Sequence, residues 1–290
     1  MKKQKTNMSN NHKAFVRKVK LQSFAVHFSR IILLILLLGI WELLATNGVI
    51  DPFLFSCPSR VCKTIYSLFT ESNLIYHSWV TLYETLLAFA ISTIIGLIVA
   101  ILLYLIPFIR RILEPFLVIL NSLPKIALGP LIIVWMGTGT KPIVAMGVLI
   151  CVVITTMNML GGFLQVEEDK IMLMKTMGAN KISIFTKLIF PFNLSNLMSC
   201  LKINIGMAWV GVVMGEYLTS KAGLGYLIVY GGQVFKLDLV MSAIVVLCTL
   251  AAIMYLIIAL IEKYVNKKHW NLNIFIQIKI KNGAIAPFFL

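Results

Sequence analysis

The sequence predicts an all-α integral membrane protein with six transmembrane helices, because its composition and its apolar patterning both exclude a soluble domain. Of the 290 residues, 59% are apolar and only 13% are charged, whereas a soluble domain has about 25% charged residues. The apolar residues form long continuous runs. Within lipid only helices and closed barrels satisfy every backbone hydrogen bond, and continuous rather than alternating runs indicate helices.

The first predicted span is a retained helix that follows a basic segment. Residues 1–30 contain eight Lys and Arg residues, and an apolar run covers residues 31–45. A basic start before a short apolar run also occurs in cleavable signal peptides. This basic region is too long for a signal peptide and no small-residue cleavage site follows the run, so we expect a retained helix that extends backward toward Phe24.

Five further apolar runs predict the remaining spans, at about residues 79–106, 115–136, 142–162, 197–218 and 239–261. Pro124 and Pro130 lie inside the second of these five runs, so we expect that span to be bent or broken. The chain is accordingly divided into a basic cytoplasmic N-terminal segment, a six-helix transmembrane domain and a C-terminal tail, at residues 1–30, 31–265 and 266–290.

The distribution of positive charge predicts the orientation. The net charge is +15, and with six spans nineteen Lys and Arg residues lie on the side of the termini and five on the other. Lys and Arg accumulate on the cytoplasmic side of membrane proteins, so both termini are predicted to be cytoplasmic. The same residues meet anionic lipid there, so we expect membrane lipid, and not nucleic acid, as their partner.

No metal, cofactor or catalytic centre is predicted. The four histidines show no metal-ligand spacing, and no Ser/His/Asp arrangement is present. Cys57 and Cys62 share one loop without the second close pair that a zinc site needs, and a disulfide between them would require that loop to be external. The other three cysteines lie in apolar runs and are interpreted as packing residues.

The C-terminal tail has a different pattern from the spans. Residues 271–280 read Asn-Leu-Asn-Ile-Phe-Ile-Gln-Ile-Lys-Ile, an alternation typical of a β-strand. We expect the tail to be peripheral and assign it no function.

The polar loop 165–196 is predicted to contain two short amphipathic helices separated at Gly178. Apolar residues recur there at helical spacing, at Ile171, Met174, Met177, Ile182, Phe185, Leu188 and Ile189. A polar loop with an apolar face either docks on another protein or lies on the membrane surface. Periodicity alone leaves both interpretations open.

Several motifs resemble those of ABC importer permeases. In that family a cytoplasmic loop reads Glu-Ala-Ala, three residues, Gly, nine residues and Ile-x-Leu-Pro; here Gly178 is followed after nine residues by Leu-Ile-Phe-Pro191. Met172, Leu173 and Met174 stand in place of Glu-Ala-Ala, a departure that bears on how the ATPase is contacted.

Other segments are similar to the nitrate/sulfonate/taurine branch of the same family. These are Leu-Pro-Lys-Ile-Ala-Leu-Gly-Pro-Leu at 123–131 with Trp-Met-Gly-Thr-Gly at 135–139, and Gly-Met-Ala-Trp at 206–209 with Gly215-Glu216 and Gly-Leu-Gly at 223–225. The matches follow one order between about residues 75 and 265.

The resemblance implies an ABC type I importer-like fold and a permease subunit that moves a small solute by ATP-driven alternating access. Two copies of this chain would form the pore as a homodimer, with two separate ATPase subunits and an extracytoplasmic solute-binding protein. The chain has no Walker run of Gly-x-x-x-x-Gly-Lys-Ser/Thr, so it is expected to be a transport subunit and not an enzyme. Substrates in this branch include nitrate, sulfonates, taurine and pyrimidine vitamin precursors.

Two other functions would leave different marks in the sequence. An ion-gradient-driven secondary transporter would need coupling ionisable residues at mid-membrane and usually an internal repeat, and a membrane-embedded enzyme would need a polar catalytic constellation. Neither feature is evident in the sequence.

The resemblance assigns an ATPase-coupling role to residues 166–191, with Met172, Lys175, Gly178, Ala179, Phe185 and Pro191 as its candidate residues. Gly178 is expected to break the two helices and Pro191 to stop the second one. The candidates for the translocation pathway or its gate are Lys125, Trp209 and Glu216. Glu42 and Glu84 lie near the outer ends of their spans, where we expect them to reach interfacial water.

Overall fold

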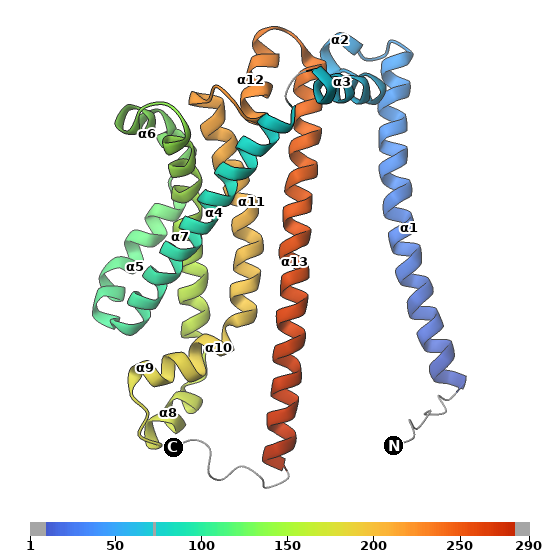
Figure 1. Ribbon diagram of the computed structural model, residues 1–290. Helices are drawn as coiled ribbons and strands as arrows, with labels where there is room; N and C mark the ends of the chain where they lie inside the picture. The colour runs from blue at the N-terminus through green and yellow to red at the C-terminus, as the bar shows by residue number, and fades with distance from the viewer. Residues whose placement is uncertain (1–9, 72–73, 282–290) are drawn as a thin grey trace.

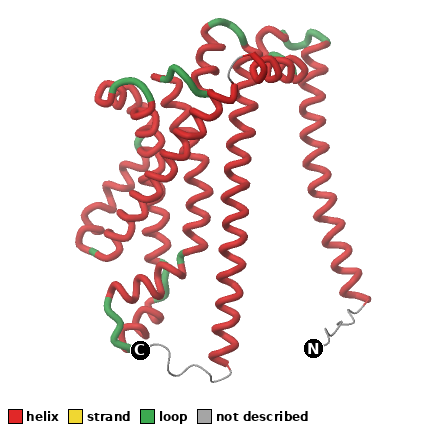
Figure 2. The backbone as a smooth tube through the Cα atoms, viewed as in Figure 1, coloured by secondary structure: helices red, strands yellow, loops and turns green. Residues whose placement is uncertain are grey.

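The computed structural model describes residues 10–71 and 74–281, and these ranges contain helices and turns with no strand (Figures 1 and 2). The membrane-length helices run roughly along one direction, and shorter helices lie across both ends of the bundle. The predicted all-α class is therefore confirmed over the described residues.

The longer helices are α1 (Asn10–Thr46), α3 (Pro58–Glu71), α4 (Leu74–Leu105), α5 (Pro107–Ser122), α7 (Thr140–Leu164), α11 (Leu194–Thr219), α12 (Leu224–Gln233) and α13 (Leu237–Lys281). The shorter elements are α2 (Pro52–Phe55), the 3₁₀ turn η1 (Lys125–Leu128), α6 (Gly129–Met136), α8 (Glu168–Thr176), α9 (Lys181–Ile184), the π-helical turn η2 (Phe185–Ile189) and α10 (Phe190–Phe192).

Five described helices are long and apolar enough to cross a membrane, and there are six such spans if a bent pair of helices is counted as one. The bent pair is α5 with η1–α6, whose axes differ by 86°. This agrees with the prediction of a broken span near Pro124 and Pro130. The first helix of the pair begins earlier than predicted, at Pro107, because proline fits the first turn of a helix, where its missing N–H is not needed.

The centre of the bundle is formed by α4, α7 and α11, which approach one another at glycines. A Cβ atom on Gly211 of α11 would lie 2.6 Å from the Cα atom of Gly147 in α7. A Cβ atom on Gly96 of α4 would lie 2.5 Å from the Thr155 side chain in α7. Small residues allow such close helix packing within lipid, so these glycines fix how tightly the three helices pack.

Helix α1 stands apart from this bundle and is joined to it at one end through α2 and α3 (Figure 1). The Glu42 carboxylate accepts hydrogen bonds from the backbone N–H and the hydroxyl of Ser59, at 3.0 and 2.7 Å. These contacts hold α1 to α3. Cys57 and Cys62, near the start of α3, are both free thiols.

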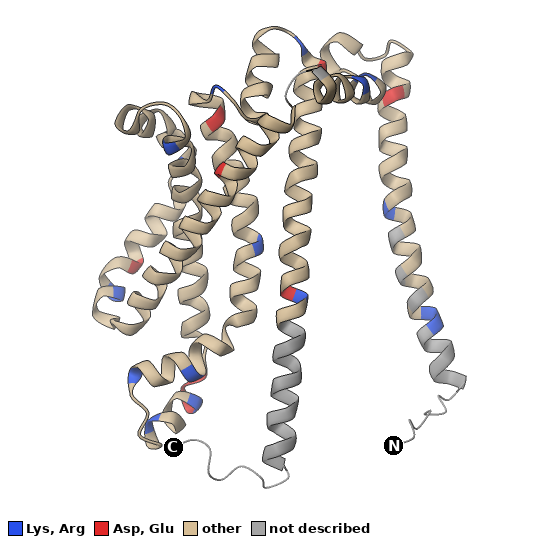
Figure 3. Ribbon diagram, in the orientation of Figure 1, with Lys and Arg blue, Asp and Glu red and all other residues tan. Residues whose placement is uncertain are grey.

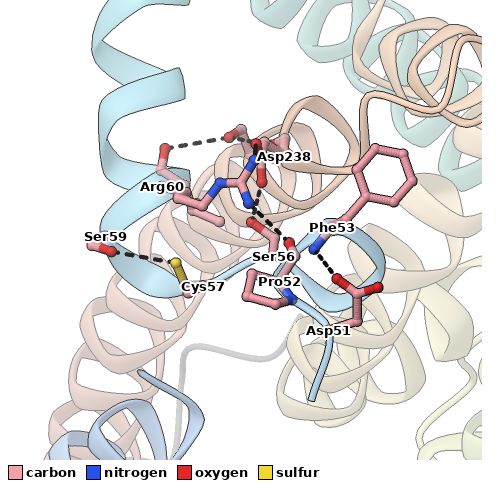
Figure 4. Close-up of polar contacts among 10 residues, drawn as sticks. Asp51, Pro52, Phe53, Ser56, Cys57, Ser59, Arg60 and Asp238 are labelled. Carbon is pink, nitrogen blue, oxygen red and sulfur yellow. Dashed lines mark hydrogen bonds and ion pairs between the residues drawn. The ribbon is translucent and has the colours of Figure 1, made fainter. Parts of the chain in front are cut away.

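A polar cluster then ties α2 and α3 to the start of α13 (Figure 4). The Arg60 guanidinium lies 2.8 Å from the Asp238 carboxylate and donates to the Pro52 carbonyl at 3.2 Å. The Ser56 hydroxyl donates to the same Asp238 at 2.6 Å. One basic side chain thus connects three helices at this end of the molecule.

The strand-like alternation of the tail does not correspond to a strand where the structure describes it. Helix α13 continues through Lys281, so residues 271–281 are helical, and residues 282–290 lie outside the described residues. A lone strand has no neighbour with which to pair, whereas extending an existing helix needs no new nucleation. The helix therefore prevails over the alternating side-chain pattern.

Candidate functional site

Two polar regions lie at opposite ends of the central bundle. One is the α8–α10 segment, residues 166–191, where many of the charged residues in Figure 3 gather. The other is the N-terminus of α12 with the parts of α4 and α11 that contact it, which we call the α12 cap. Most of the predicted site residues fall in one of these two regions.

The α8–α10 segment consists of two short helical pieces with a sharp break, as predicted. Gly178 has a φ of +81°, a conformation that residues with a Cβ atom adopt at a cost of about 1–2 kcal/mol. After the break the Asn180 side chain accepts a hydrogen bond from the Ser183 N–H at 2.7 Å. This cap restarts the helix at Lys181.

One face of the segment is buried against the bundle. Phe185 forms an aromatic cluster with Tyr104 of α4, Phe163 of α7 and Phe190, with ring centroids 5.2–6.1 Å apart. Ala179 also packs on this core. A displacement of the segment therefore acts directly on α4 and α7.

The other face presents large apolar side chains to the outside. Met172 and Leu173 are 66% and 62% exposed, and Met177 and Ile182 are similarly exposed. A groove of about 250 Å³ lies beside Gly178, lined by Met174, Met177, Ala179, Asn180, Ser183 and Lys187. Lys175 lines a second groove, of about 220 Å³, with Lys181 and the ends of α4 and α5.

The second helical piece does not stop at Pro191, contrary to the expectation. The preceding residues form a π-helical turn and Pro191 lies inside α10, which ends at Phe192 with Asn193 as its C-cap. Proline lacks an N–H and clashes with the carbonyl four residues earlier, and a widened turn relieves that clash. Pro191 thus distorts the helix, and the change of direction follows two residues later.

At the α12 cap, side chains from two other helices receive the first N–H groups of α12. The Gly223 N–H donates to His77 Nδ1 at 3.0 Å and the Leu224 N–H donates to Thr81 Oγ1 at 2.7 Å. The Gly225 N–H donates to Glu216 Oε2 at 2.6 Å. The open N–H groups of a helix start attract negative charge, so the Glu216 carboxylate is well placed to hold α12.

Two glycines make this arrangement possible. Gly223 has a φ of +112°, and a Cβ atom there would collide with the Glu216 carboxylate. A Cβ atom on Gly225 would lie 2.7 Å from Glu216 Oε2. The Gly-Leu-Gly run therefore leaves room for the carboxylate against the backbone.

Glu84 belongs to the same region, which corrects the expectation that it reaches interfacial water. Glu84 and Glu216 are each 1% exposed, and their side chains interact with each other. His77, Thr81 and Glu84 recur at i, i+4 and i+7, so they share one face of α4. That polar stripe on an otherwise apolar helix is the signal in the sequence that identifies Glu84.

The other pathway candidates lie away from the cap. Trp209 is buried against Ile205, Met254 and Ile258 between α11 and α13, and its indole N–H has no partner. The half-buried Lys125 lies in η1, at the corner of the broken span, and donates to the Asn121 carbonyl at 3.1 Å. Across residues 10–71 and 74–281, no group of three or more metal-ligating side chains is found.

Comparison with known proteins identifies the family. Residues 92–269 match the family described as binding-protein-dependent transport system inner membrane component. A probable ABC transporter permease protein of Haemophilus influenzae is 32% identical over 220 residues, which cover 76% of this chain and 89% of that protein. The taurine transport system permease protein TauC of Escherichia coli is 25% identical over 241 residues, covering 81% and 88%.

A third relative and one solved structure agree with this assignment. The formylaminopyrimidine transport permease protein ThiX of Halalkalibacterium halodurans is 30% identical over 192 residues, covering 66% of this chain and 76% of that protein. A chain from the inward-facing MetNI methionine ABC transporter has a TM-score of 0.60 at 21% identity, covering 66% of this chain and 95% of that one; this likeness concerns the fold. The chain therefore belongs to the family of binding-protein-dependent transport system inner membrane components, as the multi-pass permease subunit of an ABC importer, and not to the secondary transporters or enzymes.

Proposed function

We propose that residues 166–191 are the segment through which ATPase subunits drive this permease. The observation that carries the proposal is the two-sided character of the segment: Phe185 is buried among aromatic rings of α4 and α7, while Met172 and Leu173 are exposed. An exposed apolar face beside Lys175 suits a groove on another protein. Force applied to that face reaches the transmembrane helices through Phe185.

Gly178, Ala179 and Pro191 shape this coupling segment. Gly178 supplies the break between the two helical pieces, Ala179 packs the second piece onto the core, and Pro191 distorts the helix before it enters α11. Met172 takes the place of the usual loop glutamate, so we propose that contact with the ATPase at this position is apolar.

The orientation and assembly follow from the same proposal. The coupling segment and both termini face the cytoplasm, residues 1–30 form the basic cytoplasmic segment, and residues 31–265 form the transport domain followed by the 266–290 tail. Two copies of the chain form a homodimer in lipid over two ATPase subunits. The solute-binding protein docks at the opposite end, where α3 and α12 lie (Figure 1).

The transported solute is proposed to be small and of the class that the relatives carry. Their names specify taurine, aliphatic sulfonates and formylaminopyrimidine, so nitrate-, sulfonate- or taurine-like anions or a pyrimidine vitamin precursor are the candidates. Glu216 is proposed to gate the outer end through α12. Trp209 has an unsatisfied buried N–H and Lys125 lies at a bend, so both are proposed as pathway residues.

Co-purification and ATPase activity test the coupling role. The tagged chain is purified from its native membrane with and without Lys175→Ala and Gly178→Ala, and Lys63→Ala on the exposed face of α3 is the matched control. We expect an ATPase subunit to co-purify with the control as with the unmodified chain, and the two loop variants to release it or to uncouple hydrolysis from transport. Unchanged assembly and transport in both loop variants would exclude this role.

A further inference from the structure

The two carboxyl groups of the α12 cap lie together without a cation beside them. Glu84 on α4 and Glu216 on α11 are both almost fully buried, and their carboxyl groups are close enough to interact electrostatically. Among the described residues, the recorded ion pairs are Arg60–Asp238, Lys170–Glu167 and Lys202–Glu262. None of them neutralises the carboxyl pair.

Two carboxyl oxygens of the pair lack a hydrogen-bond donor. Glu84 interacts with the Thr140 side chain, and Glu216 with the Thr81 side chain and the Gly225 N–H. Glu84 Oε2 and Glu216 Oε1 have no donor. An ionised carboxylate only accepts hydrogen bonds, so a proton on one of the two groups would turn it into a donor for the other.

We propose that Glu84 and Glu216 share one proton, and that Glu84 is thereby the positioning residue that keeps the Glu216 carboxylate on the N-terminus of α12. Two ionised carboxylates in contact, buried and unpaired, repel each other strongly. With one shared proton the pair carries a single negative charge. That charge faces the N–H groups at the start of α12, where it is stabilised.

Removal of the shared proton opens the cap. Two negative charges in contact drive Glu216 away from Glu84, and Glu216 then leaves the Gly225 N–H. The consequence for transport rests on the proposed gating role of Glu216, whereas the shared proton itself does not depend on that role.

The other titratable groups around the pair act separately. Tyr217 lies next to Glu216 in α11, and Tyr226 of α12 stacks on His77 with ring centroids 6.0 Å apart. His77 Nδ1 accepts the Gly223 N–H, which requires that nitrogen to be unprotonated. Protonation of His77 in acid would therefore also loosen the cap, at Gly223 rather than at Gly225.

Infrared spectroscopy detects the shared proton directly. The full chain is purified in lipid and its spectrum is compared in H₂O and D₂O at neutral pH with those of Glu84→Gln and Glu216→Gln. Glu114→Gln is the matched control, because Glu114 is an exposed glutamate on α5. We expect a protonated-carboxyl band that persists in the control and disappears in both cap variants.

Hydrogen exchange at the start of α12 tests the positioning role. The Gln amide in Glu84→Gln donates to Glu216 as the shared proton does, so we expect exchange of residues 223–227 to stay slow. Glu84→Ala removes that donor, and loss of one buried hydrogen bond should raise exchange there by about tenfold. Base-catalysed exchange rises with pH in every variant, so protection is compared after correction for the intrinsic rate. In the unmodified chain this protection should fall at alkaline pH, and in Glu84→Gln it should not.

Either of two results overturns the proposal. The first is the absence of a protonated-carboxyl band in the unmodified chain. If added sodium then slows hydrogen exchange of residues 223–227, the pair is a cation site. The second is equally fast exchange in Glu84→Gln and Glu84→Ala. Both readouts are independent of transport and of ATPase binding, so they are distinguishable from a failure of the proposed function.

Discussion

The α12 cap and the α8–α10 segment differ in where their contacts lie, because the cap is held by hydrogen bonds inside the chain and the segment exposes apolar side chains. At the cap, the first N–H groups of α12 are received by His77, Thr81 and Glu216 from within the chain. At the α8–α10 segment, the Met172 and Leu173 side chains point outward and are largely exposed. The first N–H groups of α12 thus find their acceptors within one subunit, whereas we propose that a second protein covers the exposed face of the segment.

This difference separates two kinds of mutational effect. A change in the cap should destabilise the chain itself, because it breaks contacts between α4, α11 and α12. A change on the outer face of the segment should leave the chain intact and weaken only its association with the ATPase. The inner face of the segment, where Phe185 is buried, should behave like the core.

The largest expected effect is that of Phe185→Ala. Removing a buried aromatic ring costs about 3–5 kcal/mol, and here it also detaches the segment from α4 and α7. We expect a lower thermal unfolding temperature of the purified chain and transport that no longer follows ATP hydrolysis. Phe192→Ala, at a more exposed phenylalanine, is the control. Equal stability of the two variants would show that the aromatic cluster does not anchor the segment.

Gly223→Ala should have the next largest effect. The φ of +112° and the approach of the Glu216 carboxylate both oppose a side chain, at a cost of about 1–3 kcal/mol. Gly139→Ala is the control that separates the two effects, because Gly139 has a φ of +110° but open space around it. The difference between the two variants therefore measures the steric clash with the Glu216 carboxylate. Thermal unfolding should show a larger loss of stability for Gly223→Ala than for Gly139→Ala. Identical losses of stability would mean that backbone strain alone is responsible.

Leu173→Ser should change binding more than stability. The side chain is exposed, so its loss should alter unfolding by no more than about 0.5 kcal/mol. We expect Leu173 to belong to the minority of interface residues whose truncation costs more than about 1 kcal/mol, which is a several-fold weaker ATPase affinity. Val49→Ser removes an equally exposed apolar residue at the other end and should change neither quantity. A titration in which both variants bind the ATPase normally would place the interface elsewhere.

Arg60→Ala should have the smallest effect. Its ion pair with Asp238 is partly exposed, and such pairs contribute about 0–1 kcal/mol. Hydrogen exchange should become faster in α2 and at the start of α3, whereas exchange in α4, α7 and α11 should not change. The difference between Arg60→Ala and the unmodified chain should be smaller at high salt. Lys63→Ala on the same helix is the control, and a global loss of stability in Arg60→Ala would contradict a local role.

The sequence predicted the features that depend on neighbouring residues. The spans follow from apolar runs, the break at Gly178 from one glycine, and the bend near Pro124 from two prolines. The alternating pattern of the tail was a poor guide to its structure, because alternation in residues 271–281 does not outweigh continuation of an existing helix.

The cap could not be predicted in the same way. The Gly223 N–H meets a histidine 146 positions earlier, and the Leu224 N–H meets a threonine 143 positions earlier. No local pattern encodes such pairings. Glu84 was placed at the interface because it lies near the end of an apolar run, whereas its position on the face of α4 that packs on α11 decides its burial.

Photo-crosslinking from position 173 tests the central claim most directly. A photoreactive residue is introduced in place of Leu173 in the native membrane. A second preparation carries it in place of Lys63, in α3 at the opposite end of the helical bundle. We expect position 173 to crosslink to the ATPase subunit and position 63 not to do so. An ATPase crosslink from position 63 alone, or crosslinks from position 173 to lipid alone, would contradict it.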